Sequence, residues 1–315
     1  MGIHYKFQNT ENQKIDDVGR QLEKVMRNCN QGSYATRYRH AAAMSRFIKW
    51  LVPTYGVQKI SNVNDKHLIS YGKYLIEACK SHKYIKDELS GIRFVHRHTP
   101  NCRNELGDGE MINRQIGLHS TPNGICDRKW TSHEFKAMVA RAYETDNEKI
   151  ALMMEFALRF GARLDETASM RRHILEMALK SNLLKLENTK GGRVRYVPIY
   201  AEDHEFITRC ITGVARGEYV FCPKDKSVHQ LKKHTQEFIG KNRSTIQDTD
   251  RRKTAHGVHN HERGALSFHG LRHSFSRIEY ERLIAELKND RQARKELSQR
   301  LGHSRIDITK TYLGI

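Results

Sequence analysis

Apolar residues recur at helical spacing through most of this chain, and only one segment has the composition of paired strands. The spacing arises because an α-helix turns once in about 3.6 residues and buries one face. The exception comprises residues 183–188 and 193–199, which are rich in Leu, Val, Tyr and Ile and flank the turn sequence Thr-Lys-Gly-Gly at 189–192. The sequence therefore predicts a mainly α fold with one small antiparallel β-hairpin in its C-terminal half.

Four amphipathic helices are expected in the first part of the chain. They cover residues 15–28, 36–51, 65–79 and 84–97. The second should end at Val52-Pro53, because proline cannot donate to the helical hydrogen-bond ladder. Outward positions carry mostly basic side chains, namely Arg37, Arg39, His40, Arg46, Lys49, Lys80, His82, Lys83, Arg93 and Arg97. A solvated face and a DNA-facing surface would both have this pattern, and the shortage of acidic partners favours DNA.

The apolar periodicity fades between residues 100 and 129, where Asn, Gly, Asp, Pro and Arg collect. Such a composition is typical of a linker. A chain of 315 residues with 38% hydrophobic side chains can form two cores. We therefore expect three parts, which are a helical DNA-binding module over 1–120, a linker over 121–129 and a second module over 130–315.

The second module is expected to be helical apart from the hairpin. A Thr-Ser pair precedes Glu134 in the pattern of a helix N-cap. An apolar helix over 149–160 should stop at Gly161. The stretch 239–266 contains so many Lys, Arg, Asn, Asp and His residues that we expect a loop or a flexible segment there.

The charge of the chain indicates a polyanionic partner. Lys and Arg number 55 against 36 Asp and Glu, which gives a net charge of +19. Neutralising nucleic-acid phosphates releases condensed counterions, so an excess of this size favours nucleic acid. A membrane surface is the alternative, but no run approaches about 18 apolar residues, and signal-peptide, myristoylation and C-terminal Cys patterns are missing. We expect a prokaryotic, cytoplasmic, nucleoid-associated protein that does not bind a membrane.

The spacing of Cys and His favours neither a metal site nor disulfides. The sequence contains no Cys-x-x-Cys pair, and its cysteines are Cys29, Cys79, Cys102, Cys126, Cys210 and Cys222. Without a signal peptide, free thiols in a reducing compartment are the expected state. The best metal candidate is His256-x-x-His259-x-His261-Glu262, and no second ligand cluster accompanies it. We expect no metal and no other cofactor.

Six polar residues of the second module stand where local structure would present them together, namely Arg163, Lys190, His269, Arg272, His303 and Tyr312. Arg163 follows a Gly-Ala pair at an expected helix start, and Lys190 lies in the expected turn of the hairpin. The next two are three residues apart and share one side of a helix. His303 belongs to a Leu-Gly-His sequence, and Tyr312 belongs to a helix that an expected capping box at 304–307 begins. Each residue alone has an ordinary structural explanation, such as a surface ion pair or a core position.

In this order and spacing, the motifs resemble the catalytic domain of the tyrosine site-specific recombinases, also called the phage integrase family. The motifs are Gly-Ala-Arg-Leu-Asp-Glu at 161–166, the strand–Lys-Gly-Gly–strand hairpin, His-Gly-Leu-Arg-His at 269–273, and Leu-Gly-His at 301–303 with Tyr312 nine residues later. The resemblance covers about 150–315, and the first module resembles the SAM-like helical core-binding domain of that family. It implies a DNA strand-exchange enzyme that integrates or excises a mobile element.

The resemblance also implies a role for each of the polar residues. Arg163 and Arg272 would hold the non-bridging oxygens of the scissile phosphate, and His303 would hydrogen-bond that phosphate. His269 would assist proton movement at the tyrosine. Lys190 would protonate the leaving 5′-oxygen.

The tyrosine, Tyr312, would be the nucleophile and would form a 3′-phosphotyrosyl bond. Residue chemistry independently supports this reading, because a phosphodiester under attack needs fixed positive donors, and the guanidinium fork matches phosphate oxygens. Tyr has an unperturbed pKa of about 10, so it needs nearby cations and a proton acceptor to react near neutral pH. The sequence has no evident carboxylate cluster spaced for two Mg²⁺ and no Gly-x-x-x-x-Gly-Lys loop, which fits a metal-free reaction without ATP.

Two alternative functions remain at the level of sequence. A type IB topoisomerase-like enzyme would use similar residues to relax supercoils, and a catalytically idle DNA-binding protein could share the scaffold. The interval between Arg272 and His303 is longer than expected of the family, so we expect an extra helical turn or loop within 280–295. Only three residues follow Tyr312, too few to reach a neighbour's groove. We therefore expect a monomer in solution that forms a tetramer on DNA, with accessory DNA-bending or directionality proteins as further candidate partners.

Overall fold

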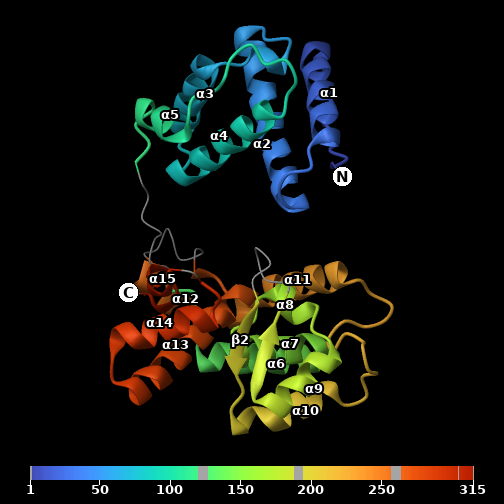
Figure 1. Ribbon diagram of the computed structural model, residues 1–315, viewed down its shortest axis with the longest axis vertical. Helices are drawn as coiled ribbons and strands as arrows, with labels where there is room; N and C mark the ends of the chain where they lie inside the picture. Colours follow the sequence, from blue (N-terminus) through green and yellow to red (C-terminus); the bar gives the residue numbers. More distant parts are fainter. Residues whose placement is uncertain (1, 120–126, 188–193, 257–263, 304, 315) are drawn as a thin grey trace. The chain divides into compact units, whose positions relative to one another are not determined.

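The computed structural model describes residues 2–119, 127–187, 194–256, 264–303 and 305–314 (Figure 1). The chain forms two compact units, Met1–Pro122 and Asn123–Ile315. Within the described residues, unit 1 is helical and unit 2 is helical with one two-stranded sheet. This architecture is the predicted mainly α fold with a single antiparallel hairpin. None of the described helices is long and apolar enough to cross a bilayer.

Unit 1 contains five α-helices and one short 3-10 helix in its described part. They are α1 (Gln13–Asn28), α2 (Tyr34–Tyr55), η1 (Ile60–Asn62), α3 (Asp65–Glu77), α4 (His82–Arg97) and α5 (Gly109–Gln115). The four expected helices are present, and the side chains of Asn12, Ser33 and Ser81 cap α1, α2 and α4. The sequence did not predict α5, because this helix is short and lies where the apolar periodicity fades.

Apolar side chains between α2 and its neighbours α1 and α4 form the core of unit 1. Met44, Phe47 and Leu51 of α2 are buried in it. Gly91 of α4 permits a close approach to α2, since a Cβ there would lie 2.9 Å from the Cβ of Ala43. A larger residue at position 91 would therefore push the two helices apart.

The predicted end of the second helix at Val52-Pro53 is wrong. α2 continues through the exposed Pro53 to Tyr55 and ends at Gly56, which has a left-handed φ of 64°. Proline removes only its own N–H from the ladder, and the Gly56 N–H still donates to the Val52 carbonyl at 2.9 Å. An exposed proline in the last turn is therefore tolerated, and glycine provides the stop.

Two of the cations predicted to face outward from unit 1 have partners within it. Arg37 is 9% exposed and donates to the Cys29 carbonyl at 2.8 Å, so its prediction as an outward side chain is wrong. Arg46 forms an ion pair with the buried carboxylate of Glu88. Helical periodicity could not show these contacts, because both partners lie outside the helix that carries the arginines. Exposed cations remain at Arg39, Lys80, Lys83 and Arg97.

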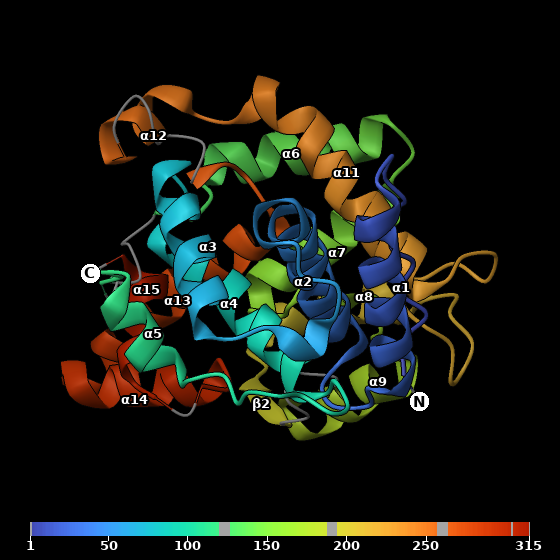
Figure 2. The ribbon, with the colours of Figure 1, turned by 90° about the horizontal axis from the view of Figure 1, so that it is seen from above.

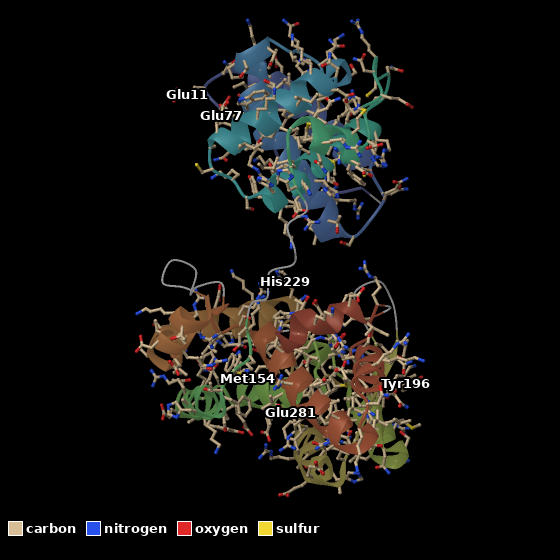
Figure 3. The ribbon with its side chains drawn as sticks, turned by 90° about the vertical axis from the view of Figure 1, so that its left-hand side faces the viewer. Glu11, Glu77, Met154, Tyr196, His229 and Glu281 are labelled. Atoms are coloured by element: carbon tan, nitrogen blue, oxygen red, sulfur yellow. The ribbon has the colours of Figure 1, made fainter. Side chains whose placement is uncertain are left out.

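Unit 2 has its core around α7 and α13. Its described elements are α6 (Ser132–Glu144), α7 (Glu148–Phe160), α8 (Leu164–Ala168), α9 (Arg172–Ser181), β1 (Leu183–Leu186), β2 (Arg195–Pro198), η2 (Ala201–Asp203), α10 (His204–Ile211), α11 (Val228–Ile246), α12 (Thr249–His256), α13 (Phe268–Leu287), α14 (Asp290–Arg300) and α15 (Asp307–Leu313). α6 packs on α7 and lies alongside α11 (Figure 2). Met154 of α7 is fully buried, whereas Tyr196 of β2 is exposed (Figure 3).

The start and stop signals expected in unit 2 are found at α6 and α7. The Thr131 hydroxyl accepts from the Glu134 N–H at 3.1 Å, and the Glu134 carboxylate accepts from the Thr131 N–H at 2.7 Å. This reciprocal pair is a capping box. α7 ends at Gly161, whose φ of 57° favours glycine.

The hairpin is present with its strands in antiparallel register. Leu184 of β1 lies opposite Val197 of β2, and both are buried. Lys185 lies opposite Tyr196 on the outward face. The turn that joins the strands lies outside the described residues.

The prediction of a loop over 239–266 is wrong for residues 239–256. α11 continues to Ile246, and α12 follows directly. Two residues of this polar stretch attach it to the core of unit 2. Ile239 is buried, and the buried guanidinium of Arg252 forms an ion pair with Glu134 at 2.8 Å. The extra residues expected within 280–295 are mostly helical, because α13 runs to Leu287 and α14 begins at Asp290, so that only Lys288 and Asn289 lie between the two helices. α15 begins at Asp307 with Ile306 as its N-cap, which is later than the predicted start after Ser304. The capping box expected at 304–307 is not tested, because Ser304 lies outside the described residues.

Candidate active site

Arg163 is positioned by the turn between α7 and α8. It is the N-cap of α8, directly after Gly161-Ala162. Its backbone N–H and its guanidinium both donate to the Glu166 carboxylate, at 2.8 and 2.7 Å. The Glu166 side chain is buried, whereas that of Arg163 keeps 22% exposure. The expected helix start therefore presents the partly exposed guanidinium of Arg163, which the buried Glu166 carboxylate holds in place.

Arg272 lies in the second turn of α13 and is fully buried. Its guanidinium donates to the Gly161 carbonyl at 2.5 Å and to the Leu301 carbonyl. Among the described residues, no carboxylate forms an ion pair with it. Burial, followed by the charge of Arg195, lowers the pKa of Arg272 to about 9. A buried cation without a counterion favours the binding of an anion.

His303 lies beside this guanidinium, with Nε2 3.5 Å from Nη2 of Arg272. The left-handed Gly302, with φ of 68°, turns the chain after α14, and the His303 N–H donates to the Ser298 carbonyl at 2.8 Å. Burial, then the charges of Arg272 and Arg163, lower the pKa of His303 to about 4. The imidazole is therefore neutral near pH 7 in the free protein. A phosphate bound here would raise its pKa by adding a negative charge.

Tyr312 lies on α15, with its hydroxyl 3.5 Å from Nε2 of His269. Its ring centroid is 4.6 Å from that of His273 and 5.3 Å from that of His303. The Arg272 guanidinium carbon lies 5.5 Å from the same centroid. The tyrosine is thus held among three imidazoles and one guanidinium, with its oxygen directed at an imidazole.

His269 is neutral near pH 7 in the free protein. Burial, followed by the charges of Arg272 and Arg128, lowers its pKa to about 4. A neutral imidazole can accept a proton, which a protonated one cannot. The arrangement can therefore receive the phenolic proton of Tyr312.

Five of the six residues singled out in the sequence come together in unit 2. They are Arg163, His269, Arg272, His303 and Tyr312, which lie on α8, α13, the loop after α14, and α15. The sixth, Lys190, lies in the turn of the hairpin, outside the described residues. Arg195 also contributes to this site and was not predicted from the sequence. The available signal was its inward position on β2, because a charged residue on the buried face of a strand requires a partner.

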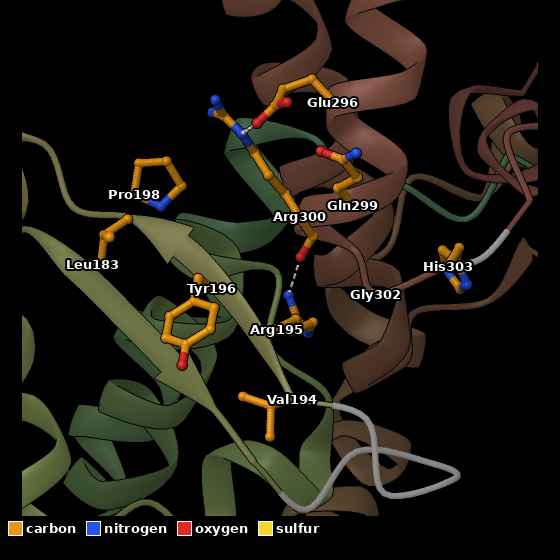
Figure 4. A pocket seen from close by; sticks show the side chains of 10 residues that line it. All are labelled: Leu183, Val194, Arg195, Tyr196, Pro198, Glu296, Gln299, Arg300, Gly302 and His303. Carbon is orange, nitrogen blue, oxygen red and sulfur yellow. Dashed lines mark hydrogen bonds and ion pairs between the residues drawn. The ribbon is translucent and has the colours of Figure 1, made fainter.

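A pocket of about 480 Å³ opens beside His303, between the outer face of the hairpin and α14 (Figure 4). Figure 4 shows Tyr196 on the strand side, and Arg195 below Arg300 with a hydrogen bond to the carbonyl of that residue. A second pocket of about 390 Å³ is lined by Arg163 and His269 together with Gln236 and Arg243 of α11. Three of the five assembled residues therefore line these two pockets, His303 the first and Arg163 and His269 the second.

No metal site is evident in the described part of the chain, where no group of three or more His, Cys, Asp or Glu side chains could hold an ion. The candidate cluster at 256–262 is not tested, because His259, His261 and Glu262 lie outside the described residues. The described cysteines are free thiols, and Cys126 also lies outside that part.

The Phage integrase family model matches residues 129–314 of the chain, which is more than half of it. Among solved structures, the Tn1549 transposon integrase in complex with transposon right end DNA is 14% identical, with 94% of each chain covered and a TM-score of 0.56. A lambda integrase tetramer bound to a Holliday junction is 14% identical, with 94% of this chain and 76% of that chain covered and a TM-score of 0.58. A lambda integrase dimer bound to a COC′ core site is 15% identical, with 96% and 77% covered and a TM-score of 0.55.

At these identities the structures show a common fold and nothing finer. No curated protein sequence matches the chain. The family match covers the whole region that contains the five assembled residues. The chain therefore belongs to the phage integrase family, the tyrosine recombinases, which cleave and rejoin DNA.

Proposed function

We propose that this protein recombines double-stranded DNA at specific sites and that Tyr312 is its nucleophile. The Tyr312 oxygen forms a bond to phosphorus while the bond from phosphorus to the 5′-oxygen breaks. The phenolic proton passes to His269, and the product is a 3′-phosphotyrosyl linkage with a free 5′-hydroxyl. The observation that carries this proposal is the position of Tyr312. Its hydroxyl lies 3.5 Å from a neutral imidazole, and its ring lies beside the buried Arg272 guanidinium, which forms no ion pair with a described carboxylate.

The scissile phosphate would bind where three donors converge. Arg163 and Arg272 hold its non-bridging oxygens, and His303 donates a hydrogen bond once the phosphate has raised its pKa. These groups stabilise the charge that develops on the equatorial oxygens as phosphorus becomes five-coordinate. Because they are fixed by the turn at Gly161 and the loop before His303, little reorganisation is needed at the moment of reaction.

Lys190 is proposed as the general acid that protonates the leaving 5′-oxygen. Its place in the hairpin turn rests on the sequence and on the family resemblance, since the turn lies outside the described residues. Attack by that 5′-hydroxyl reverses the reaction and releases Tyr312, so strands are rejoined without ATP.

In this proposal unit 1 binds DNA and unit 2 catalyses its cleavage and rejoining. Residues 1–120 form the core-binding domain, 121–129 the linker and 130–315 the catalytic domain. Exposed cations of unit 1 at Arg39, Lys80, Lys83 and Arg97 would contact phosphates. The protein would be a monomer in solution that assembles as a tetramer on its site, and light scattering with and without site DNA would measure this.

Integration or excision of a mobile element is the proposed biological role. Its support is the likeness of fold to integrases of a transposon and a phage. A type IB topoisomerase-like enzyme and a catalytically idle DNA-binding protein are the alternatives. The candidate active site favours an enzyme over an idle DNA-binding protein, because five polar side chains of the expected types converge there.

Two assays on the same protein separate these functions. A suicide DNA substrate, which loses the 5′-hydroxyl fragment after cleavage, should trap an adduct that survives SDS, and an idle protein would give none. A plasmid with two copies of the site should then yield exchanged products rather than relaxation alone. Relaxation of plasmids that lack the site would favour the topoisomerase instead.

A further inference from the structure

Two buried guanidinium groups, those of Arg195 and Arg272, converge on the carbonyl of Gly161. Arg195 donates to it at 3.0 Å and Arg272 at 2.5 Å. Each arginine also donates to a carbonyl at the end of α14, Arg195 to that of Arg300 and Arg272 to that of Leu301. The turn before Arg163 is therefore tied to the loop before His303 by two parallel bridges.

Arg195 differs from its neighbour in its remaining contacts. Its guanidinium donates to the Glu166 carboxylate at 2.6 Å, and Glu166 is the group that holds Arg163. Its stem packs against Gly302, where a Cβ would lie 2.9 Å from Cδ of Arg195. With 1% of its side chain exposed, it is buried to the same degree as Arg272. Arg195 thus touches the supports of two proposed phosphate ligands, and its hydrogen bonds go to those supports rather than to Arg163 or His303 themselves.

We propose that Arg195 is a positioning residue that sets the separation between Arg163 and His303. The proposal rests on the proposed function, in which these two side chains bind the scissile phosphate. Three acceptors are arranged around one planar fork, namely the Gly161 carbonyl, the Glu166 carboxylate and the Arg300 carbonyl. The compact ammonium of Lys cannot reach all three in one plane. Because β2 carries Arg195, the same contacts anchor the hairpin to the active site.

A purely structural role would require only that the Arg195–Glu166 pair keeps the fold stable. The chain offers a matched control for that possibility in Arg252. This residue is also 1% exposed, pairs with the buried Glu134 at 2.8 Å and donates to a backbone carbonyl, that of Gly264. It makes no described contact with Arg163, His303 or Tyr312. Substitution of Arg252 therefore removes an equivalent buried pair outside the proposed site.

The test compares Arg195→Lys with Arg252→Lys on a suicide DNA substrate, below the melting temperature of each variant. Arg195→Lys should form adduct at least about tenfold more slowly at saturating DNA, because small displacements of positioned groups cost large factors in rate. Its Kd for DNA should stay within about threefold of the wild-type value, since most binding comes from other phosphate contacts. Arg252→Lys should lose stability to a similar extent and keep its rate within about twofold.

Chemical rescue gives a second readout. Arg195→Ala leaves a cavity shaped for a guanidinium ion, so millimolar guanidinium chloride should speed its adduct formation, and the same concentration of NaCl should not. Arg252→Ala should show no such recovery. Normal cleavage by Arg195→Lys, an equal loss of rate in both Lys variants, or a loss confined to Kd would overturn the proposal. If the wild-type protein forms no adduct, it is the proposed function that fails.

Discussion

Replacement of Arg272 by Met should strongly slow cleavage with little effect on stability, which is unusual for a fully buried residue. No carboxylate in the described part of the chain pairs with Arg272, and burial lowers its pKa to about 9. Each pKa unit corresponds to about 1.4 kcal/mol, so holding the charge inside the folded protein costs on the order of 5 kcal/mol. Met removes that cost.

Met also removes the hydrogen bonds to the Gly161 and Leu301 carbonyls. A buried acceptor left without a donor costs about 1–3 kcal/mol. Losing both donors therefore costs about 2–6 kcal/mol, which offsets the roughly 5 kcal/mol that the protein gains when the buried charge is removed. The free energy of unfolding of Arg272→Met should therefore lie between about 1 kcal/mol below and about 3 kcal/mol above the wild-type value. Arg195→Met leaves the buried Glu166 paired only with the partly exposed Arg163 among its described partners, so it should instead lose about 3 kcal/mol, the lower end of the cost of breaking a buried pair.

Urea denaturation of both variants without DNA measures these free energies, and a suicide substrate measures cleavage. Cleavage by Arg272→Met should fall at least roughly 10²-fold, because a preorganised donor to the transition state is lost. Equal destabilisation of the two variants would refute the reasoning. Arg272 would then be a structural cation rather than one held ready for phosphate.

Three further predictions address other residues. Arg163→Ala should slow single-turnover cleavage roughly 10²-fold with nearly unchanged DNA affinity, and a defect in affinity alone would contradict this. Lys190→Ala should recover on a substrate with a 5′-bridging sulfur, which leaves without protonation, and equal defects on both substrates would exclude a general acid. Burial, aided by nearby cations, lowers the pKa of His269, His273 and His303 to about 4, 3 and 4. Below about pH 6.5 the unfolded chain binds protons that the folded chain does not, so stability should be complete above that pH and fall toward pH 4. Denaturation at pH 7.5 and 5.0 checks this, and a smaller loss is expected for His273→Gln.

Local signals in the sequence were sufficient for most of the secondary structure. The Thr-Ser pair before Glu134 and the glycine at 161 act within one helical turn, so their effects are visible without the fold. The alternation in β1 and β2 likewise encodes which residues face the core. Ordered motifs also identified five residues that converge, because the family resemblance supplied the long-range pairing that periodicity lacks.

What the sequence did not predict depends on partners far along the chain. The polar composition of 239–266 predicted a loop, whereas Arg252 in that stretch pairs with Glu134, 118 residues away. Arg195 was not predicted as a functional residue, because its acceptors at Gly161 and Arg300 lie 34 and 105 residues away in the sequence. A single sequence does not state which distant carbonyl or carboxylate a charged side chain will meet.

The identity of the covalently linked residue tests the central claim most directly. Wild-type protein should be trapped on a suicide DNA substrate, and proteolysis followed by mass spectrometry should find the nucleotide on the peptide that contains Tyr312. Tyr312→Phe keeps the ring contacts with His273 and His303 but lacks the hydroxyl. It should bind DNA with wild-type affinity and form no adduct. An SDS-resistant adduct of the Phe variant, or a nucleotide attached to a different residue of the wild-type protein, would contradict the account.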